Sequence, residues 1–481
     1  MRNIRRLSIA WLLLGGVSLA AVGCGDDDSI DPVVDAGRVD SGMTPEEDAG
    51  TEPGEDGGTE PGEDGGSTPL PEYCPELPEP GTAPSCPADA PEVVVAGGDI
   101  GDTSWTCANT YRLTGNVFVT SGVLSIGAGT RIIADNRGAL IVTPNARIDA
   151  QGHPSAPIVF TSSQEVRDRG DWGGIVLLGS APINVAGGTD NIEGIEASET
   201  RGIYGGTNAA HDCGTMRYVR IEFAGRVLAA DNELNGLTMG GCGSATDIEF
   251  VQVHRGSDDA FEMFGGSPNL RFVVASGMED DGLDWDQGYV GNIQYAVVHR
   301  FADAATGDPN GIEADNLNGS NDATPRSNPN VYNVTLVTSD STTPNQFGAV
   351  LRRGTHGTIR NAIVQGFPTG VDVRDAAGEA AVGDALTFHN SIFFDNGADF
   401  PAGSPEATAF TAAAAMNRTG MDPMLGSLSE SAPNYTPGAT ELVTTGAATP
   451  PASLDQNATF IGAIAPGCPS WMAGWTAFPV E

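Results

Sequence analysis

The chain repeats one strand pattern, Ile248-Glu-Phe-Val-Gln-Val, Leu270-Arg-Phe-Val-Val-Ala and Ile293-Gln-Tyr-Ala-Val-Val, at intervals of 22 and 23 residues. A second pattern alternates with the first, as in Ala260-Phe-Glu-Met-Phe and Gly282-Leu-Asp-Trp-Asp. Repeats of this length are typical of solenoids, in which each coil buries its apolar side chains only against its neighbours. Helical periodicity is almost absent, so we predict an all-β body.

The short strands between Gly, Asn and Asp turns favour a right-handed parallel β-helix of the pectin-lyase-like kind. Side chains alternate between the two faces of a strand. In the second pattern, the side chains that should point into the core are Phe261, Met263, Leu283, Trp285, Ile312 and Val371. The residues between them should face water. Longer intervals between repeats indicate loops inserted at one corner, notably over residues 304–328.

The N-terminus has the features of an export signal. Three arginines precede an apolar run over residues 7–22 that is too short to span a bilayer comfortably. The run ends in Ala21-Val22-Gly23-Cys24, which is similar to the lipobox of bacterial lipoproteins. We therefore expect residues 1–23 to be a signal peptide and Cys24 to carry a lipid. This anchor should hold the protein at the outer membrane, with its body at the cell surface or facing the periplasm.

Four further segments follow the signal peptide. Residues 24–70 are rich in Asp, Glu, Gly and Pro, which predicts a disordered acidic tether. Residues 71–110 hold three cysteines and should form an N-terminal cap. Residues 111–400 should form the β-helix, and residues 401–481 a C-terminal cap and closing segment.

The formal charge of the chain is −40, and residues 1–70 contribute 15 acidic residues and four arginines to it. The body therefore carries about −29. Such an acidic body argues against nucleic acid and anionic lipid surfaces as partners. Apart from the membrane that holds the anchor, we expect a glycan or another envelope protein as partner.

Six cysteines remain after Cys24, namely Cys74, Cys86, Cys107, Cys213, Cys242 and Cys468. An even number in an exported protein indicates disulfides, and no Cys-x-x-Cys spacing suggests a metal site. The sequence leaves every connectivity open. Neighbours in sequence favour Cys74 with Cys86 and Cys213 with Cys242. The remaining pair, Cys107 with Cys468, would join the two ends of the body.

Acidic residues line the outward side of the second pattern. Stacking the repeats gives one outward column of Thr238, Glu262, Asp284, Glu313, Val350 and Asp372, and a next column of Phe264, Asp286, Asp315, Arg352 and Arg374. Asp258-Asp259 and Asp280-Asp281 lie 22 residues apart and hence on adjacent rungs. Rungs are about 4.8 Å apart, so ionised carboxylates stacked in this way repel one another.

Such a stack needs a neutralising partner. Ca²⁺ takes about six to eight oxygen ligands. The candidate metal ligands are Asp258, Asp259, Asp280, Asp281, Asp284, Asp286, Glu313 and Asp315. In one alternative, these carboxylates cap tight turns and are neutralised by arginines. The arginines available for this are Arg255, Arg352, Arg353 and Arg374.

A catalytic patch is the other alternative, because paired carboxylates can serve as acid and base on a glycosidic bond. The candidates are Asp258, Asp259, Asp284, Asp286 and Glu313. Gly256-Ser-Asp-Asp-Ala resembles the double-aspartate motif of polygalacturonase-type β-helix hydrolases. That family's Asn-Thr-Asp, Gly-His-Gly and Arg-Ile-Lys motifs have no counterpart. His254 and His299 close equivalent rungs, and we expect them in polar turn or groove roles instead of metal ligation.

Longer stretches carry a family resemblance. They include Trp172-Gly-Gly-Ile-Val-Leu-Leu-Gly-Ser-Ala-Pro-Ile, Arg217-Tyr-Val-Arg-Ile-Glu-Phe-Ala-Gly, Val253-His-Arg-Gly-Ser-Asp-Asp-Ala-Phe-Glu-Met-Phe-Gly-Gly and Asp280-Asp-Gly-Leu-Asp-Trp-Asp-Gln-Gly-Tyr. Together with the C-terminal region they resemble, over roughly residues 95–481, a family of bacterial outer-membrane lipoproteins that includes a leptospiral one of similar size. The resemblance implies a β-helical lipoprotein and supplies no reaction.

The sequence thus favours a non-enzymatic, cation-stabilised binding or structural protein of the cell envelope. The alternative is a polysaccharide-active β-helix enzyme, a hydrolase or a lyase, that uses the stacked carboxylates.

Overall fold

The computed structural model describes residues 69–196, 198–229, 232–304 and 309–480. The predicted signal peptide, the lipidation site Cys24 and nearly all of the predicted tether lie outside the described residues. They stay predictions.

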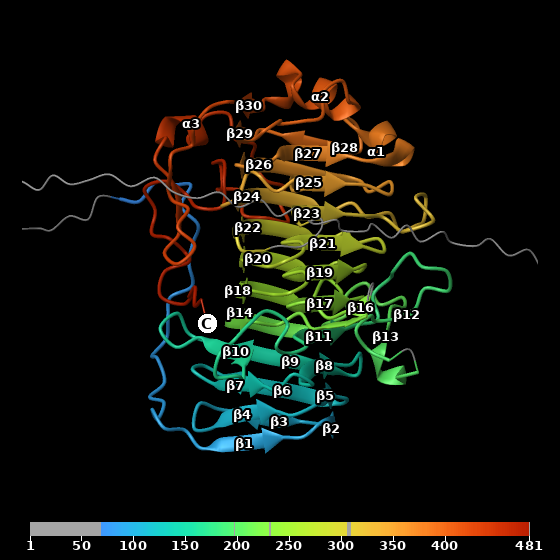
Figure 1. Ribbon diagram of the computed structural model, residues 1–481, viewed down its shortest axis with the longest axis vertical. Coiled ribbons are helices and arrows are strands. Elements are labelled where there is room, and N and C mark those ends of the chain that lie inside the picture. Colours follow the sequence, from blue (N-terminus) through green and yellow to red (C-terminus); the bar gives the residue numbers. More distant parts are fainter. Residues whose placement is uncertain (1–68, 197, 230–231, 305–308, 481) are drawn as a thin grey trace, which may run out of the picture. The chain divides into compact units, whose positions relative to one another are not determined.

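Two long ladders of strands run through the body and stack as the rungs of a β-helix (Figure 1). The ten-stranded ladder consists of β2 (Gly98–Ile100), β5 (Asn116–Val119), β8 (Ala139–Val142), β11 (Ile175–Leu178), β17 (Leu237–Gly240), β19 (Phe261–Phe264), β21 (Leu283–Asp286), β23 (Asn310–Ala314), β25 (Phe347–Leu351) and β27 (Thr369–Val373). Its strands pair in parallel throughout, as expected for a solenoid.

The second ladder has 16 strands, also paired in parallel. Its path consists of β1 (Glu92–Val95), β4 (Thr110–Leu113), β7 (Arg131–Ala134), β10 (Ile158–Ser162), β14 (Gly214–Glu222), β18 (Asp247–His254), β20 (Asn269–Ser276), β22 (Asn292–Arg300), β24 (Asn330–Thr338), β26 (Gly357–Gln365), β29 (Ile392–Phe394) and β30 (Arg418–Thr419). Beside this path lie β3 (Thr103–Trp105), β6 (Gly122–Gly127), β9 (Ala146–Gln151) and β28 (Leu386–His389). The predicted all-β parallel β-helix is confirmed.

The remaining elements are short. They are the strand pairs β12 (Asp190–Asn191) with β13 (Ile203–Tyr204), β15 (Val227–Ala229) with β16 (Asn232–Glu233) and β31 (Leu425–Ser427) with β32 (Asn434–Pro437), and the helices α1 (Asp375–Ala381), α2 (Pro405–Phe410) and α3 (Thr440–Thr444). No helix among the described residues has the length and apolar character needed to cross a bilayer.

Each long rung of the 16-stranded ladder bends once, which gives the β-helix three faces. Up to Arg217, β14 pairs with β9, and from Val219 onward it pairs with β10. Between them, Tyr218 has a φ of +52°. The same left-handed bend recurs at Phe250, Phe272, Tyr295, Asn333, Asn361 and Asn390. Asn tolerates this backbone better than an aromatic residue does, so the aromatic positions need compensating contacts.

Stacking supplies those contacts. The ring centroids of Phe250 and Phe272 are 4.4 Å apart, and Tyr218 and Tyr295 extend the stack at 4.5 and 4.6 Å. Such spacing is favourable for aromatic pairs. The parallel register therefore turns one strained corner position into a continuous aromatic column.

A C-terminal segment, residues 446–480, crosses the outside of this corner, and we call it the closing strap. Trp475 meets Phe250 edge to face at 6.1 Å, and Trp471 meets Phe272 at 5.5 Å. Farther along, the side-chain amides of Asn333 and Asn361 donate to backbone carbonyls of the closing strap, at 3.1 Å for Ala458 and 2.8 Å for Ala448. The closing strap is thus fastened to successive rungs by rings and by amides.

The core confirms the predicted inward positions. Phe261, Met263, Leu283, Trp285, Ile312 and Val371 are all buried in the main apolar core.

The rungs begin before residue 111 and continue past residue 400, because β1 and β30 both belong to the 16-stranded ladder. Among the described residues β1 pairs only with β4, and Val93 and Val94 are 39% and 60% exposed. The sequence of β1 therefore lacks the alternation of apolar and polar residues by which the other rungs were recognised.

The predicted disulfide pairing was right for one bond and wrong for two. All six cysteines are bonded, and Cys213 pairs with Cys242 as predicted. The other bonds join Cys74 to Cys468 and Cys86 to Cys107. The prediction paired cysteines that are close in sequence. In the structure the segment before β1 runs alongside the closing strap, where the hydroxyl of Tyr73 donates to the Pro466 carbonyl, so Cys74 lies beside Cys468.

The predicted exposure of the outward side chains was wrong for much of the ten-stranded ladder. Residues 179–196 and 198–213, between β11 and β14, form a covering loop over its outer face. Ile183, Ile192 and Tyr204 of the covering loop pack against outward side chains of the ladder such as Val176 and Phe264. The sequence had placed the main inserted loop elsewhere, over residues 304–328.

Two buried histidines fasten the C-terminal region to the rungs. His254 Nε2 donates to the Pro479 carbonyl of the closing strap at 2.8 Å, and His299 Nδ1 lies 2.8 Å from the Tyr435 hydroxyl. Burial lowers the pKa of each imidazole to about 3. Both rings are therefore neutral in the folded protein at neutral pH.

We predict that the replacements His254→Gln and His299→Gln, made together, flatten the acid dependence of the melting temperature. Each folded pKa lies below the unfolded value of about 6.5, so the stabilisation is complete above that pH and is lost as pH falls toward about 3, at about 1.4 kcal/mol per pH unit and histidine. Thermal melts at pH 7 and pH 4 measure the difference. His153→Gln, on the surface, serves as control, and an unchanged slope in the double variant would contradict the prediction.

Candidate metal centre

The strand register brings the predicted acidic column together. Glu262 pairs with Asp284 on the next rung, and Asp284 pairs with Glu313 on the rung after that. Thr238 precedes this series and Val350 follows it, as the repeat predicts. Ladder hydrogen bonds hold neighbouring rungs about 4.8 Å apart, so the backbone cannot relax to separate the carboxylates.

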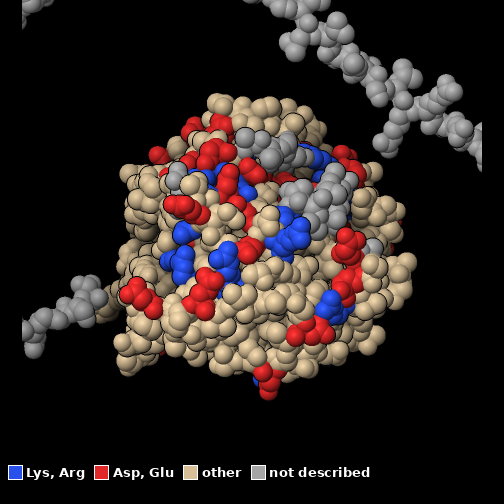
Figure 2. Space-filling view, turned by 60° about the horizontal axis from the view of Figure 1, so that its bottom comes forward, with Lys and Arg blue, Asp and Glu red and all other residues tan. Residues whose placement is uncertain are grey.

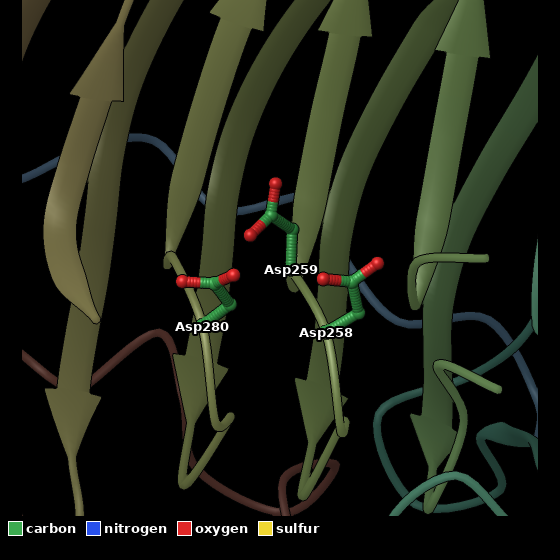
Figure 3. Close-up of side chains that lie close together, drawn as sticks. All are labelled: Asp258, Asp259 and Asp280. Carbon is green, nitrogen blue, oxygen red and sulfur yellow. The ribbon is translucent and has the colours of Figure 1, made fainter. Parts of the chain in front are cut away.

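Carboxylates gather in three overlapping groups at this part of the ladder, and within each group the ligand oxygens lie within 4.8 Å of one another. The groups are Asp258, Asp259 and Asp280; Asp259, Glu262 and Asp284; and Asp281, Asp284 and Glu313. Figure 3 shows the first group, in which Asp280 on one rung extends its carboxylate toward Asp258 and Asp259 on the neighbouring rung. Because Asp259 and Asp284 each belong to two groups, the seven residues form one acidic cluster.

Much of the acidic cluster is withdrawn from water. Asp281, Asp259 and Glu262 are 3%, 6% and 7% exposed. Neutral donors serve these three carboxylates: the Asn235 side-chain amide donates to Glu262, and the Asp281 backbone amide donates to Asp259 at 2.8 Å. The Asn310 backbone amide donates to Asp281 at 2.6 Å. Hydrogen bonds from neutral groups leave the negative charge in place.

Burial and mutual repulsion raise the pKa values in the acidic cluster. Burial, followed by the charge of Asp280, raises the pKa of Asp258 to about 8. Burial and neighbouring carboxylates raise the pKa values of Asp259, Glu262 and Asp281 well above the ordinary range. A bound divalent cation or a proton would relieve both effects.

Arginines neutralise one end of the acidic column, as the second hypothesis expected. Arg352 pairs with Glu313 and, through Nε at 2.9 Å, with Asp315. Arg353 also pairs with Asp315. Farther along, Arg374 Nε lies 2.9 Å from an oxygen of Asp372. Ion pairs with arginines therefore neutralise the carboxylates at the C-terminal end of the column.

Three sequence candidates lie outside the acidic cluster. Asp315 belongs to the arginine pairs, and Asp286 accepts a hydrogen bond from the Gln287 amide at 2.5 Å. Arg255, expected as a neutralising partner, pairs instead with Asp303 at 2.8 Å. The other six predicted ligands are brought together in the three carboxylate groups.

Asp284 has the environment of a cation ligand. Its Oδ1 atom is buried and has no hydrogen-bond partner among the described residues. In register it lies between Glu262 and Glu313. Burial, then the charges of Asp315 and Asp286, raises its pKa well above the ordinary value. Buried polar atoms are almost always partnered, and a hard cation is a partner that carboxylate oxygens accept.

Sequence reasoning missed three residues of this site. Glu262 stood in the predicted column but was not chosen as a ligand, although its position beside Asp284, on the rung that follows Asp258 and Asp259, was a usable signal. Glu193 reaches Glu262 from the covering loop, and the two carboxyl groups share a hydrogen bond. Asn235 donates to Glu262. Glu193 and Asn235 lie in irregular segments outside the repeat, so periodicity could not reveal them.

Comparison with known proteins gives one match. The family described as a pectate-lyase like beta helix domain matches residues 98–476. No curated protein and no solved structure matches the chain.

We predict that, in the presence of a chelator, Asp258→Asn raises the melting temperature at pH 8.5 and changes it little at pH 4. The folded pKa of about 8 exceeds the unfolded value of about 3.9, so the wild type loses stability as pH rises through that interval. An asparagine cannot ionise and escapes this loss. Asp384→Asn, at an exposed position, is the control; equal melting temperatures of wild type and Asp258→Asn at pH 8.5 would refute the prediction.

Proposed function

We propose that this chain, which belongs to the family of pectate-lyase-like β-helix domains, is a non-enzymatic, calcium-stabilised binding or structural protein of the cell envelope. The lipobox-like Ala21-Val22-Gly23-Cys24 supports a lipid anchor at Cys24. The resemblance to the leptospiral lipoprotein family supports attachment to the outer membrane. Residues 24–70 would then separate the body from the membrane as a tether.

The buried, unpartnered Oδ1 atom of Asp284 carries the calcium proposal. Asp284 belongs both to the group with Asp259 and Glu262 and to the group with Asp281 and Glu313, and it flanks Glu262 and Glu313 at rung spacing. The Arg352 pair neutralises Glu313 and leaves the charge of the first group in place. Ca²⁺ tolerates irregular coordination by about six to eight oxygens. The acidic cluster offers enough oxygens for such coordination.

The Glu193–Glu262 pair also supports a cation. Two carboxyl groups that share a hydrogen bond hold a proton between them. A cation that binds beside them would stabilise both carboxylates in the ionised form, and the proton would be released to solvent. Since Glu193 belongs to the covering loop, cation binding would stabilise the contact between this loop and the ladder. The cation would thereby add to the stability of the folded body.

A glycan or an envelope protein is the partner that the surface supports. Figure 2 shows a face on which acidic groups and arginines gather in the same areas, beside broad uncharged areas. Such mixed charge does not attract polyanions strongly. Binding would therefore depend on hydrogen bonds and shape.

An enzymatic role has one observation in its favour. Asp258, with a pKa of about 8, retains a proton at neutral pH, as a general acid for glycosidic cleavage requires. Against it, Asp259, Asp281 and Glu262 are nearly inaccessible to a sugar chain. We therefore place the polysaccharide-active enzyme second.

We predict that calcium raises the melting temperature of the wild-type protein by several degrees at pH 8 relative to chelator. At a calcium concentration of 100 times the dissociation constant, ligand binding adds about 2.7 kcal/mol to the free energy of unfolding. In Asp284→Asn the calcium effect should be lost, while the chelator-treated variant should melt above the chelator-treated wild type because repulsion is reduced. Scanning calorimetry measures all four melts, with Asp384→Asn as the matched control.

If neither calcium nor chelator changes the melting temperature of the wild-type protein, the calcium proposal is wrong. Turnover of any member of a polysaccharide panel by the wild type, abolished in Asp258→Asn and retained in Asp384→Asn, would establish the enzymatic alternative. Inertness of the wild type across the panel supports the binding role.

A further inference from the structure

A cavity of about 730 Å³ opens at a corner of the β-helix, toward its N-terminal end and away from the acidic cluster. The turns before β2, β5 and β8 form one wall, and residues 194–196 of the covering loop form another. Arg137 and Arg226 line it. We call it the corner cavity.

On a chain with a formal charge of −40, most arginines would be expected to pair with a carboxylate. In the part of the chain that the structure describes, neither Arg137 nor Arg226 forms an ion pair, although Glu196 also lines the corner cavity. One terminal nitrogen of Arg226 donates to the Asn136 carbonyl, and its Nε is buried with no hydrogen-bond partner among the described residues. Burial, then the charge of Arg137, lowers the pKa of Arg226. Two adjacent guanidinium groups with free donors attract an oxyanion.

A second observation indicates what the anion is attached to. Asn116 lines the corner cavity on the wall opposite the covering loop. A side-chain amide can donate to or accept from a hydroxyl group of a ligand. The volume of the corner cavity also exceeds what a bare phosphate needs.

We propose that the corner cavity binds a phosphate monoester carried on a hydroxylated group, such as a sugar or polyol phosphate. Arg137 and Arg226 hold the phosphate dianion, and the side-chain amide of Asn116 forms a hydrogen bond with a ligand hydroxyl. The terminal oxygens of a phosphate monoester can accept hydrogen bonds from both guanidinium groups at once. The site requires no calcium and stands independently of the proposed function.

The corner cavity and the acidic cluster share the covering loop. Glu193 faces Glu262 in the acidic cluster, and the next three residues line the corner cavity. The corner turn after β7 lies three rungs before the turn that carries Asp258 and Asp259, which corresponds to about 14 Å along the axis at rung spacing. An anion site and a cation site would therefore lie on the same corner of the molecule.

Titration calorimetry of the full-length protein in chelator tests the proposal with three probes: glucose 6-phosphate, inorganic phosphate and glucose. We expect glucose 6-phosphate to bind at least tenfold more tightly than inorganic phosphate, and glucose not to bind. Arg137→Gln and Arg226→Gln should each weaken glucose 6-phosphate binding at least tenfold. Arg147→Gln is the matched control, because Arg147 pairs with Asp212 on the surface at 2.9 Å.

Absence of glucose 6-phosphate binding, or equal binding by wild type and both arginine variants, would overturn the proposal. Arg137 is exposed, so Arg137→Gln keeps the test valid if Arg226→Gln fails to fold. Asn116→Asp places an anion beside the phosphate and should abolish binding; retention overturns the role of Asn116. Sedimentation with phosphatidylinositol 4-phosphate vesicles distinguishes a lipid headgroup from a soluble glycan source, and binding to either source supports the site.

Discussion

The parallel backbone register is the constraint on which the rest of this structure depends. It places equivalent residues of successive rungs directly above one another at about 4.8 Å. This spacing suits aromatic rings, and Tyr218, Phe250, Phe272 and Tyr295 form a stacked column at a strained corner. The same spacing is unfavourable for charge, because Glu262, Asp284 and Glu313 are held together by the identical mechanism.

Two irregular segments, the closing strap and the covering loop, pack on the outside of the regular solenoid. The closing strap covers the aromatic column and is joined to the N-terminal side of the body by the Cys74–Cys468 disulfide. The covering loop shields part of the ten-stranded ladder and brings Glu193 to Glu262 in the acidic cluster, where Asp259, Glu262 and Asp281 are buried. Burial then turns tolerable surface repulsion into a requirement for a proton or a cation, since a low dielectric environment strengthens every uncompensated charge.

Arginine placement divides the corners of the β-helix into chemically different regions. The chain has no lysine, so all 23 of its Lys and Arg positions are arginines. Arg352 and Arg353 neutralise the C-terminal end of the acidic column, Arg137 and Arg226 line the corner cavity, and the acidic cluster lies between these regions. The charge of each corner therefore depends on which turn carries an arginine and which carries an aspartate, while the ladder itself stays the same.

The solenoid, the inward residues such as Trp285, and the register of Glu262, Asp284 and Glu313 can be predicted from the sequence, because they follow from repeat length and side-chain alternation, which are local properties of a strand. Six of the residues in the acidic cluster could be identified for the same reason. The contact of Glu193 with Glu262, the Cys74–Cys468 bond and the burial of outward carboxylates become visible only in the folded chain. Those facts depend on how irregular segments far apart in the chain fold back over the ladder, and packing of that kind leaves no periodic trace in the sequence.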